Sequence, residues 1–272
     1  MRRHAAELFL GAAWLWCFGS TASADITTGL VLRFACDEIK GTGYLEDASG
    51  AENHGKAFGV TVAGGRPGFG GACHFEGGGP AYEPDTTIPA GVIHYIRVRN
   101  DVCKTKKSLD VNPDDELTLA TWYNVSPDAV EESNEQSPLI EWGGEISPSE
   151  SGVHLWAYTI GGQWGGNGTG ANLVDITGDD SSYIINTADQ PRGEWHHLVV
   201  TYNRPTKTAK VYLDGQLKNE RTFKIVPRTL EDVYIGRRPW DFQRLRGDLD
   251  EIRIYKRALS AADVQALYNF TP

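Results

Sequence analysis

The sequence predicts an all-β protein in which two antiparallel sheets pack face to face, with a short helix near the C-terminal end. Three observations predict this class. Short apolar or alternating runs recur along the chain, turn clusters such as Gly77-Gly78-Gly79-Pro80 separate them, and a helical pattern is confined to one segment. The run Leu198-Val199-Val200 would make its strand apolar on both faces, so a second layer must cover the sheet.

The segment from Gly193 to Val226 predicts three consecutive antiparallel strands. Trp195–Tyr202 and Ala209–Leu213 are rich in β-branched and aromatic residues, and a polar loop parts them. Asp214-Gly215 then supplies a two-residue turn whose backbone needs positive φ, so a third strand should begin at Gln216. We expect the other strands to assemble around this meander.

Residues 1–24 have the pattern of a secretory signal peptide. Arg2 and Arg3 precede an apolar run from Leu8 to Phe18, and the stretch ends on the small residues Ala22-Ser23-Ala24. Cleavage is therefore expected after Ala24, which leaves residues 25–272 as one secreted domain at an extracellular, periplasmic or cell-surface location. Lipid attachment at Cys17 is disfavoured because bulky residues precede it.

The remaining elements are short strands followed by one helix. The other predicted strands, in chain order, are Leu30–Phe34, Ala57–Val62, Val92–Val98, Leu117–Tyr123, Leu139–Trp142, Val153–Ile160 and Tyr183–Asn186. The helix should span Ser260–Tyr268, with Ser260 as its N-cap and Asp263 completing a capping box. Its stripe of Val264, Leu267 and Tyr268 should dock on the sandwich.

The charge balance excludes some classes of partner. The chain has 26 basic and 36 acidic residues, a formal charge of -10 that becomes -11 once Arg2, Arg3 and Glu7 leave with the leader. Nucleic acid and anionic membranes are therefore poor partners. After the leader, no apolar run is long enough to cross a bilayer, so we expect no membrane insertion.

Three cysteines follow the leader, namely Cys36, Cys73 and Cys103. An oxidising destination predicts one disulfide and one leftover thiol. Cys36 continues the alternation of Leu32 and Phe34, so we expect it in the core as a free thiol. Cys103 lies in a polar segment, where an unpaired thiol would be exposed. We therefore predict a disulfide between Cys73 and Cys103.

Several segments together resemble the laminin-G-like jelly-roll domains of the concanavalin A-like lectin and glucanase superfamily. In chain order they are GLVLRFACDE, DASGAENHG, FGGACHFEGGGPAY, LTLATWYNV, WHHLVVTY with VYLDG, and VYIGRRPW with GDLDEIRIYKRALSAADVQALY. The resemblance covers Gly29 to Tyr268 and implies a jelly-roll sandwich. It implies little about chemistry, because this scaffold carries lectins, hydrolases and adhesive modules alike.

The segment GDLDEIRIY breaks its own alternation. Ile252 and Ile254 share a face while Leu249 is out of step, which predicts a β-bulge at Asp250-Glu251. The resemblance implies that the first and last strands are neighbours, which would bring Asp250 close to the early acidic loops. Converging oxygen ligands are what calcium requires, although a hydrogen-bonded acidic corner is the plainer alternative. The predicted ligands of a structural calcium are Asp37, Glu38, Asp47, Asn53 and Asp250.

Sugar sites use exposed aromatic faces with polar groups around them, on rim loops or on a concave sheet. Two loop tryptophans fit this description, so the predicted ligand-binding residues are Trp164, Asn167, Trp240 and Asp241. A tryptophan packed down as a lid is the structural alternative. A basic island could favour a sulfated or uronic-acid glycan or simply be solvated, and it comprises Arg237, Arg238, Arg244 and Arg246.

The sequence does not favour an enzyme. Sandwich glucanases of the superfamily place two carboxylates on one strand as E-x-D-x-E or E-x-D-x-x-E, and the nearest match here is Asp248-x-Asp250-Glu251. His196 and His197 are strand neighbours that should face opposite sides, one in the core and one at the surface, so they cannot share a zinc ion. Arg246-Gly247-Asp248 spells an adhesion tripeptide but falls where a strand should begin.

The sequence thus predicts a secreted, non-enzymatic module that binds a carbohydrate or an extracellular protein through rim loops, with a structural calcium. The alternatives are a polysaccharide hydrolase or lyase of the same superfamily and a purely structural cell-surface domain. Two carboxylates in one groove would favour the enzyme, whereas exposed aromatic rings over a shallow surface would favour binding.

Overall fold

The structure is a computed structural model of the whole chain. It describes residues 24–77, 94–99, 109, 116–129, 136–146, 149–159, 168–174, 182–224, 226–227, 229, 231–239 and 243–272. The strands are β1 Leu30–Phe34, β2 Tyr44–Leu45, β3 Gly55–Phe58, β4 Thr61–Gly64, β5 Gly71–Glu76, β6 Tyr95–Val98, β7 Leu117–Val125, β8 Gln136–Ile146, β9 Ser149–Thr159, β10 Thr169–Val174, β11 Ser182–Thr187, β12 His196–Asn203, β13 Thr208–Leu213, β14 Gln216–Thr222, β15 Val233–Ile235 and β16 Arg246–Tyr255. The helix is α1, Ala261–Tyr268.

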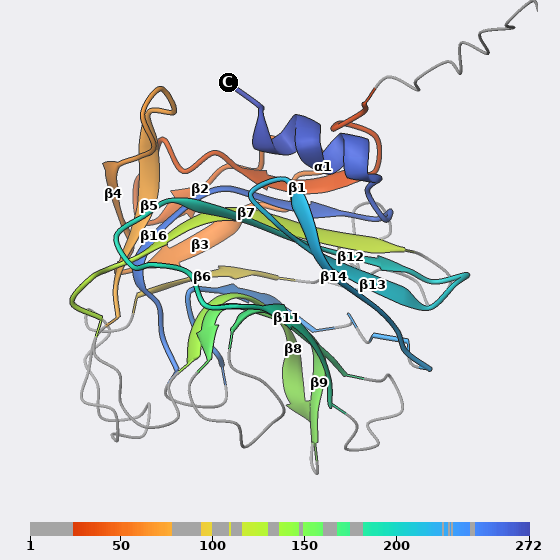
Figure 1. Cartoon of the computed structure of the whole chain (residues 1–272). Helices are drawn as coiled ribbons and strands as arrows, with labels where there is room; N and C mark the ends of the chain where they lie inside the picture. The colour runs from red at the N-terminus through yellow and green to blue at the C-terminus, as the bar shows by residue number, and fades with distance from the viewer. Residues whose placement is uncertain are drawn as a thin grey trace, which may run out of the picture.

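The strands form two antiparallel sheets, which confirms the predicted class. Sheet A has the order β14-β13-β12-β7-β16-β5-β4, with β1 also paired to β16, and sheet B has the order β11-β10-β9-β8-β15-β6-β3-β2. Figure 1 shows sheet B stacked below sheet A, with α1 lying across the far side of sheet A. The protein is therefore a two-layer sandwich with a helical cover on one side.

The central strands of sheet A, β7, β12 and β16, are buried on both faces. Phe34, Leu119 and Val200 belong to the core between the sheets, where sheet B contributes Trp142 among others. Val199, the strand neighbour of Val200, belongs to a second cluster beneath α1. This double burial explains why β12 carries consecutive apolar residues instead of an alternating pattern.

The predicted meander is confirmed. Strands β12, β13 and β14 pair in series, and β12 begins at His196, one residue after the predicted start. Asp214 and Gly215 have φ of 51° and 74°, as a hairpin turn with two positive-φ residues requires. Local turn chemistry was sufficient to predict this part of the fold.

The predicted strand Ala57–Val62 is two strands. Gly59, with φ of 65°, turns the chain between β3 and β4. β3 pairs with β6 and β2 in sheet B, whereas β4 pairs with β5 in sheet A. The prediction was wrong because a single glycine allows the chain to cross from one sheet to the other within two residues.

Two strands share one edge of β16. β5 pairs with its first half, from Arg246 to Leu249, and β1 pairs with its second half, from Ile252 to Tyr255. The register shifts between these halves, and Glu251 has φ of 49°. Two predictions are thus confirmed: the first and last strands are neighbours, and the last strand has a bulge at Asp250-Glu251. Gly247 is buried between β5 and β7, so the Arg-Gly-Asp tripeptide is part of a central strand.

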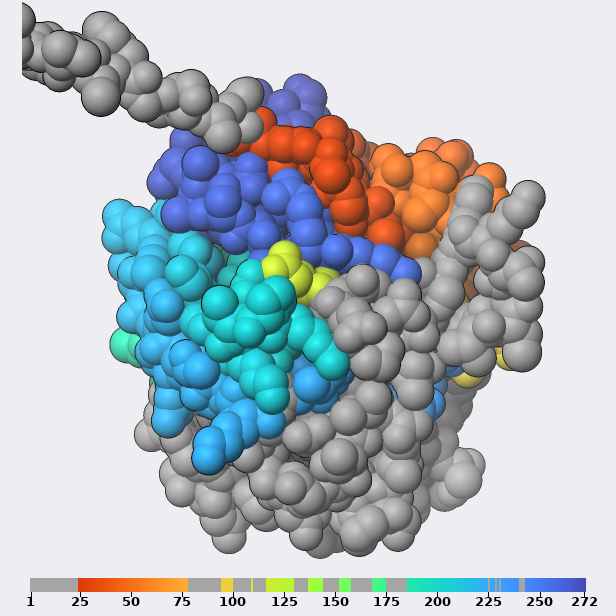
Figure 2. All heavy atoms as spheres, turned by 90° about the vertical axis from the view of Figure 1, so that its right-hand side faces the viewer, coloured from red at the N-terminus to blue at the C-terminus, as the bar shows by residue number. Residues whose placement is uncertain are grey.

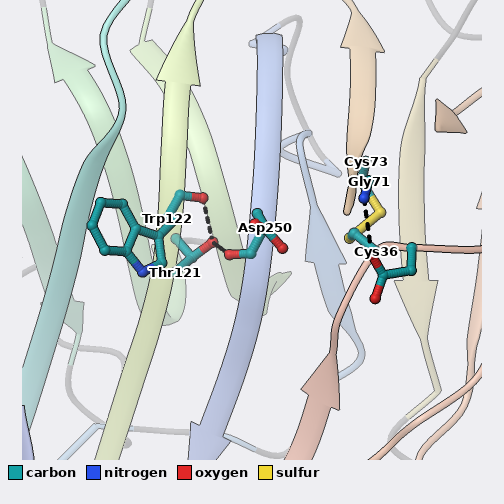
Figure 3. The surroundings of a disulfide bond; sticks show 7 residues. Cys36, Gly71, Cys73, Thr121, Trp122 and Asp250 are labelled. Carbon is teal, nitrogen blue, oxygen red and sulfur yellow. Dashed lines mark hydrogen bonds between the residues drawn. A yellow bond between two sulfur atoms is a disulfide. The ribbon is translucent and has the colours of Figure 1, made fainter. Parts of the chain in front are cut away.

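The disulfide joins Cys73 to Cys36, so the predicted partner Cys103 was wrong. The Cα atoms of Cys36 and Cys73 are 5.1 Å apart. Cys36 lies two residues after the end of β1, and Cys73 lies in β5; these two strands meet end to end along β16 (Figure 3). Cys36 is buried as predicted, but the topology places a second cysteine beside it. Cys103 lies outside the described residues.

Helix α1 confirms the predicted capping box. Ser260 is the N-cap, its side chain accepts from the Asp263 backbone N–H, and the Asp263 side chain accepts from the Ser260 backbone N–H. Val264 and Leu267 are buried against sheet A. The described part of the chain contains no helix with the length and apolar character of a membrane span.

Candidate functional site

One row of side chains crosses the outer face of sheet B, the face turned away from sheet A. Cross-strand pairing places its members opposite one another in the order Tyr44, Lys56, Arg97, Tyr234, Glu141, His154 and Asn172. Their strand neighbours, such as Ile96, Trp142 and Val153, point into the core. Because strand side chains alternate between faces, the whole row lies on the side of sheet B opposite the core between the sheets. We call these seven residues the outer-face row.

One end of the outer-face row is polar and fully buried. Glu141 and His154 are each 0% exposed, and His154 Nδ1 lies 2.7 Å from Glu141 Oε2. Arg238 Nε lies 3.6 Å from the same oxygen. Buried charges must be paired, because desolvation costs several kcal/mol per ion. This group anchors β8 and β9 to the segment after β15.

An aromatic cluster on the same face is made of Tyr234, the middle member of the row, and of Phe58 and Tyr95 from strands β3 and β6. The Phe58 and Tyr95 rings stack at 4.5 Å and 14°, and the Tyr95 and Tyr234 centroids are 6.2 Å apart. All three side chains are half-buried. The cluster therefore forms a partly accessible apolar surface on the face of a sheet.

Three cations surround the aromatic cluster. Lys56 lies 5.9 Å from the Phe58 centroid, Arg97 lies 5.8 Å from that of Tyr234, and Arg237 lies 5.1 Å from that of Tyr95. Arg97 Nε also donates to Asp232 Oδ2 at 2.7 Å. Rings edged by fixed donors suit a ligand that has an apolar face and a polar rim.

The row holds one carboxylate, Glu141, whereas glycosidases use a pair of carboxylates at the scissile bond. The bulge in β16 does bring two carboxylates together, on the outer face of sheet A. There Glu251 pairs with Arg33 and Arg253, and Asp250 pairs with Arg66. These pairings give the bulge carboxylates a structural role.

The predicted rim residues Trp164, Asn167, Trp240 and Asp241 all lie outside the described residues. The predicted basic island does not act as a unit in the parts that the structure describes. Arg237 packs over Tyr95, Arg238 faces Glu141, and Arg246 Nη2 donates to Asp128 Oδ2 at 2.7 Å on the exposed surface.

The sequence does not predict the outer-face row. Its signal was weak but present, because Glu141 interrupts the apolar run Leu139–Trp142 and His154 stands between Val153 and Leu155. A polar residue at such a position predicts only that it faces away from the core. Its neighbours depend on strand register, which the sequence does not reveal.

The predicted calcium ligands have partners within the protein. Asp47 accepts backbone N–H groups from Arg33 at 2.8 Å and from Asn53 at 2.9 Å. Asp37 Oδ1 accepts from the Gly71 N–H at 2.9 Å, and the Asn53 side chain donates to the Val31 carbonyl. No three Asp, Glu, His or Cys side chains converge as a metal site within the described residues. Calcium binding stays a prediction.

His196 and His197 face opposite sides of sheet A, as expected, but both are buried. The His196 ring lies 5.9 Å from that of Tyr123, and its Nδ1 lies 3.0 Å from Asp214 Oδ2. The His197 ring lies 5.0 Å from that of Trp122 beneath α1. The prediction that one of them lies at the surface was wrong, because α1 covers the outer face.

Asp250 sits in the bulge and pairs with Arg66, whose guanidinium contacts two aromatic rings. The Arg66 guanidinium lies 3.4 Å from the Phe69 centroid and 3.7 Å from that of Trp122, and Arg66 Nε is 3.4 Å from Asp250 Oδ2. Figure 3 shows Asp250 between β7 and the disulfide, with its backbone carbonyl facing Thr121. Burial raises the pKa of Asp250 to about 7, against the opposing attraction of Arg66.

We expect Asp250 to make the stability pH-dependent. Its folded pKa lies above the unfolded value of about 3.9, so the folded state holds the proton more tightly and stability should fall as the pH rises from about 4 to about 7. Asp250→Asn, which keeps the neutral shape, should flatten this part of a melting temperature against pH profile. The exposed Glu38→Gln serves as the control that keeps the slope. An unchanged slope in Asp250→Asn would contradict the assignment.

Comparison with known proteins gives the chain a family. Residues 98–265 match the family model described as the concanavalin A-like lectin/glucanases superfamily. No curated protein matches the sequence. Domain 4 of AbnA, a GH43 extracellular arabinanase from Geobacillus stearothermophilus solved in complex with arabinotriose, is 20% identical with a TM-score of 0.60, over 88% of this chain and 98% of that domain.

Toxin binding domains have the same fold. The binding domain of Paraclostridial Mosquitocidal Protein 1 is 15% identical with a TM-score of 0.62, over 90% of this chain and 53% of that one. The binding domain of Botulinum Neurotoxin DC in complex with SialylT is 13% identical with a TM-score of 0.61, over 90% and 52%. This chain thus spans about half the length of the toxin domains. Because the family model covers more than half of its residues, this protein belongs to the concanavalin A-like lectin and glucanase superfamily.

Proposed function

We propose that this protein is a secreted, non-enzymatic binding module that takes a carbohydrate on the outer face of sheet B. The observation that carries the proposal is the aromatic cluster of Phe58, Tyr95 and Tyr234, half-buried on a sheet face and edged by cations. A pyranose or furanose ring presents C–H groups on its face and hydroxyls around its edge. The aromatic rings would contact the C–H groups, and the charged side chains around them would hydrogen-bond to the hydroxyls.

The buried end of the outer-face row gives the surface rigidity. Glu141 contacts both His154 and Arg238, and all three are nearly inaccessible, so they hold β8, β9 and the segment after β15 together beside the aromatic cluster. A preformed surface loses little conformational entropy when a ligand binds. We assign this trio a supporting role and assign ligand contact to the aromatic cluster.

The fold relatives support carbohydrate as the ligand class. AbnA domain 4 was solved with arabinotriose, and one neurotoxin binding domain was solved with SialylT. Another structure of that toxin domain contains rat synaptotagmin II, so the scaffold also accommodates a protein partner. The stacked rings of this chain favour the sugar, and a protein partner is an alternative outcome of the test.

The charges around the cluster predict a preference among sugars. Three cations, Lys56, Arg97 and Arg237, lie beside the rings. Asp232 accepts a hydrogen bond from Arg97 and offsets part of this positive charge. A carboxylated or sulfated sugar would gain charge-assisted hydrogen bonds here. We therefore expect acidic glycans to bind more tightly than neutral ones, with an advantage that declines as salt is raised from about 0.05 M to about 0.5 M.

The test is a glycan array followed by calorimetric titration of the best ligand. We expect Tyr95→Ala and Tyr234→Ala each to weaken binding about tenfold or more, equivalent to about 1.4 kcal/mol, with melting temperatures measured to verify folding. Leu217→Ala removes a more exposed apolar side chain from sheet A, far from the aromatic cluster, and should leave binding unchanged. Repeating the titration with a calcium chelator tests the predicted calcium.

Three results would overturn the proposal. One is equal binding by the tyrosine variants, which would place the ligand elsewhere. Another is the absence of any glycan signal together with capture of a protein ligand. The third is the release of shortened oligosaccharides from a bound polysaccharide, which would favour the hydrolase or lyase alternative.

A further inference from the structure

The segment from Asp25 to Gly29 lies against the C-terminal part of the chain. Figure 2 shows these first described residues, in red, in contact with the blue C-terminal region. Tyr255 Oη donates to the Ile26 carbonyl at 3.0 Å, and Arg257 Nε donates to the Thr28 carbonyl at 2.7 Å. Arg257 Nη2 also donates to the carbonyl of Asp25. The two ends of the domain are therefore tied together by side-chain contacts.

The position of Asp25 is defined by its own side chain as well. Asp25 Oδ1 accepts the backbone N–H groups of Thr27 at 2.9 Å and of Thr28 at 3.1 Å. These bonds close a turn that directs the Asp25 backbone nitrogen toward α1. That nitrogen donates to Asp263 Oδ1 at 2.7 Å.

Asp263 is the capping carboxylate of α1 and is 6% exposed. Its Oδ2 accepts from the Ser260 backbone N–H at 3.0 Å and from Arg257 Nη1 at 2.9 Å, which leaves Oδ1 to the Asp25 nitrogen. Burial raises the pKa of Asp263, but the hydrogen bonds from Arg257, the Asp25 nitrogen and Ser260 outweigh it and lower the pKa overall. The carboxylate is therefore ionised at neutral pH.

We propose that removal of the leader after Ala24 turns the Asp25 nitrogen into an α-ammonium that forms a salt bridge with Asp263, so that processing completes the contact between the two ends of the domain. Ala24 is exposed, and its bond to Asp25 is the one at which the sequence predicts cleavage. Hydrolysis by a peptidase adds one water across this amide. Ala24 leaves as a carboxylate, and the Asp25 nitrogen takes up protons to become the ammonium.

The charges at this contact balance once the chain is cut. The ammonium and Arg257 are the cations, and the Asp263 and Asp25 carboxylates are the anions. Tyr255, whose pKa burial raises, is neutral there. A free α-amino group has a pKa of about 7.7 to 8.0, and a carboxylate partner raises it in the folded state. The added stability is thus present below about pH 8 and is lost as the pH rises through the folded pKa.

The test is a cycle of four proteins. Two proteins begin at Asp25 and are released from a fusion by a protease that leaves no extra residue. The other two carry Gly-Ser-Ala before Asp25. Each N-terminus is combined once with the native Asp263 and once with Asp263→Asn. At pH 6 we expect the protein that begins at Asp25 to melt about 2 °C or more above its extended counterpart. The difference should disappear in the Asp263→Asn pair, which lacks the carboxylate, and at pH 10, where the α-amino group is neutral. The loss of the helix cap affects both Asp263→Asn proteins equally, so it cancels in the comparison.

Equal melting temperatures for the two Asp263 proteins at pH 6 would overturn the proposal, as would a difference that persists at pH 10. N-terminal sequencing of the secreted protein tests the premise separately, and a first residue other than Asp25 would also overturn it. Glycan binding should be the same for both N-termini. Failure here is therefore distinguishable from failure of the proposed function.

Discussion

Replacing both Cys36 and Cys73 by alanine should lower the free energy of unfolding by about 4 kcal/mol, a loss of about 10 °C in melting temperature for a domain of this size. The two cysteines are 37 positions apart, so the disulfide closes a long loop and restricts the unfolded chain. It also holds β1 and β5 end to end along β16, at the place where the bulge interrupts the ladder. Chemical denaturation of native and variant proteins measures the effect.

Cys103→Ala is the matched control, because sequence analysis predicted Cys103 as the partner of Cys73. We expect this variant to keep the stability of the native protein, and a digest without reductant to yield one peptide pair joined through Cys36 and Cys73. A linked pair that contains Cys103, or a double variant as stable as the native protein, would contradict the disulfide described here.

Glu251→Ala should destabilise the fold by about 3 to 5 kcal/mol, the range found when one partner of a buried ion pair is removed. Glu251 accepts from Arg33 Nε at 2.9 Å and from Arg253 Nη2 at 2.6 Å, and the Arg253 side chain is 4% exposed. Both guanidinium groups also face the Phe270 ring. Without the carboxylate, two cations would remain together in a poorly solvated place.

The backbone at Glu251 provides a matched comparison. Its φ of 49° lies in the left-handed region, where glycine is tolerated without the steric cost that a side chain carries. The free energy of unfolding of Glu251→Gly should therefore be about 1 kcal/mol higher than that of Glu251→Ala. If the two variants are equally stable, or if alanine is the more stable, the strained bulge is not as described.

Glu251 should also contribute to acid sensitivity. Burial raises its pKa, but the hydrogen bonds and charges of Arg33 and Arg253 outweigh burial and lower the pKa overall. A lowered folded pKa means stability that is present above about pH 4.3 and lost as the pH falls below it. This loss lies at lower pH than the change expected from Asp250, so the two effects can be separated in one profile.

Strands with a strong local signal were predicted well, and strands without one were missed. β1 matches its predicted bounds, and the helix begins at the residue after its predicted cap. β10 was not predicted, because TGANLV has neither alternation nor a long apolar run, and β15 consists of only three residues. Both strands are held by neighbours on either side, so their strand conformation comes from sheet pairing.

The β16 bulge and the aromatic cluster of sheet B show the same division. The bulge at Asp250-Glu251 could be read from the broken alternation of one strand, because each residue's face is a local property. The gathering of Phe58, Tyr95 and Tyr234 could not, because these residues come from three strands far apart in the chain. Their meeting depends on the order of strands in sheet B.

From the sequence alone followed the all-β class, the meander with its Asp214-Gly215 turn, the capped helix and the bulge. These depend on backbone preferences and on side-chain periodicity within a few residues. Tertiary structure alone decided that Cys36 is the partner of Cys73, that the chain changes sheets at Gly59, and that an aromatic and charged row crosses sheet B. The reason is physical: strand order and register are set by burial across the whole sandwich, and many registers satisfy the same local pattern.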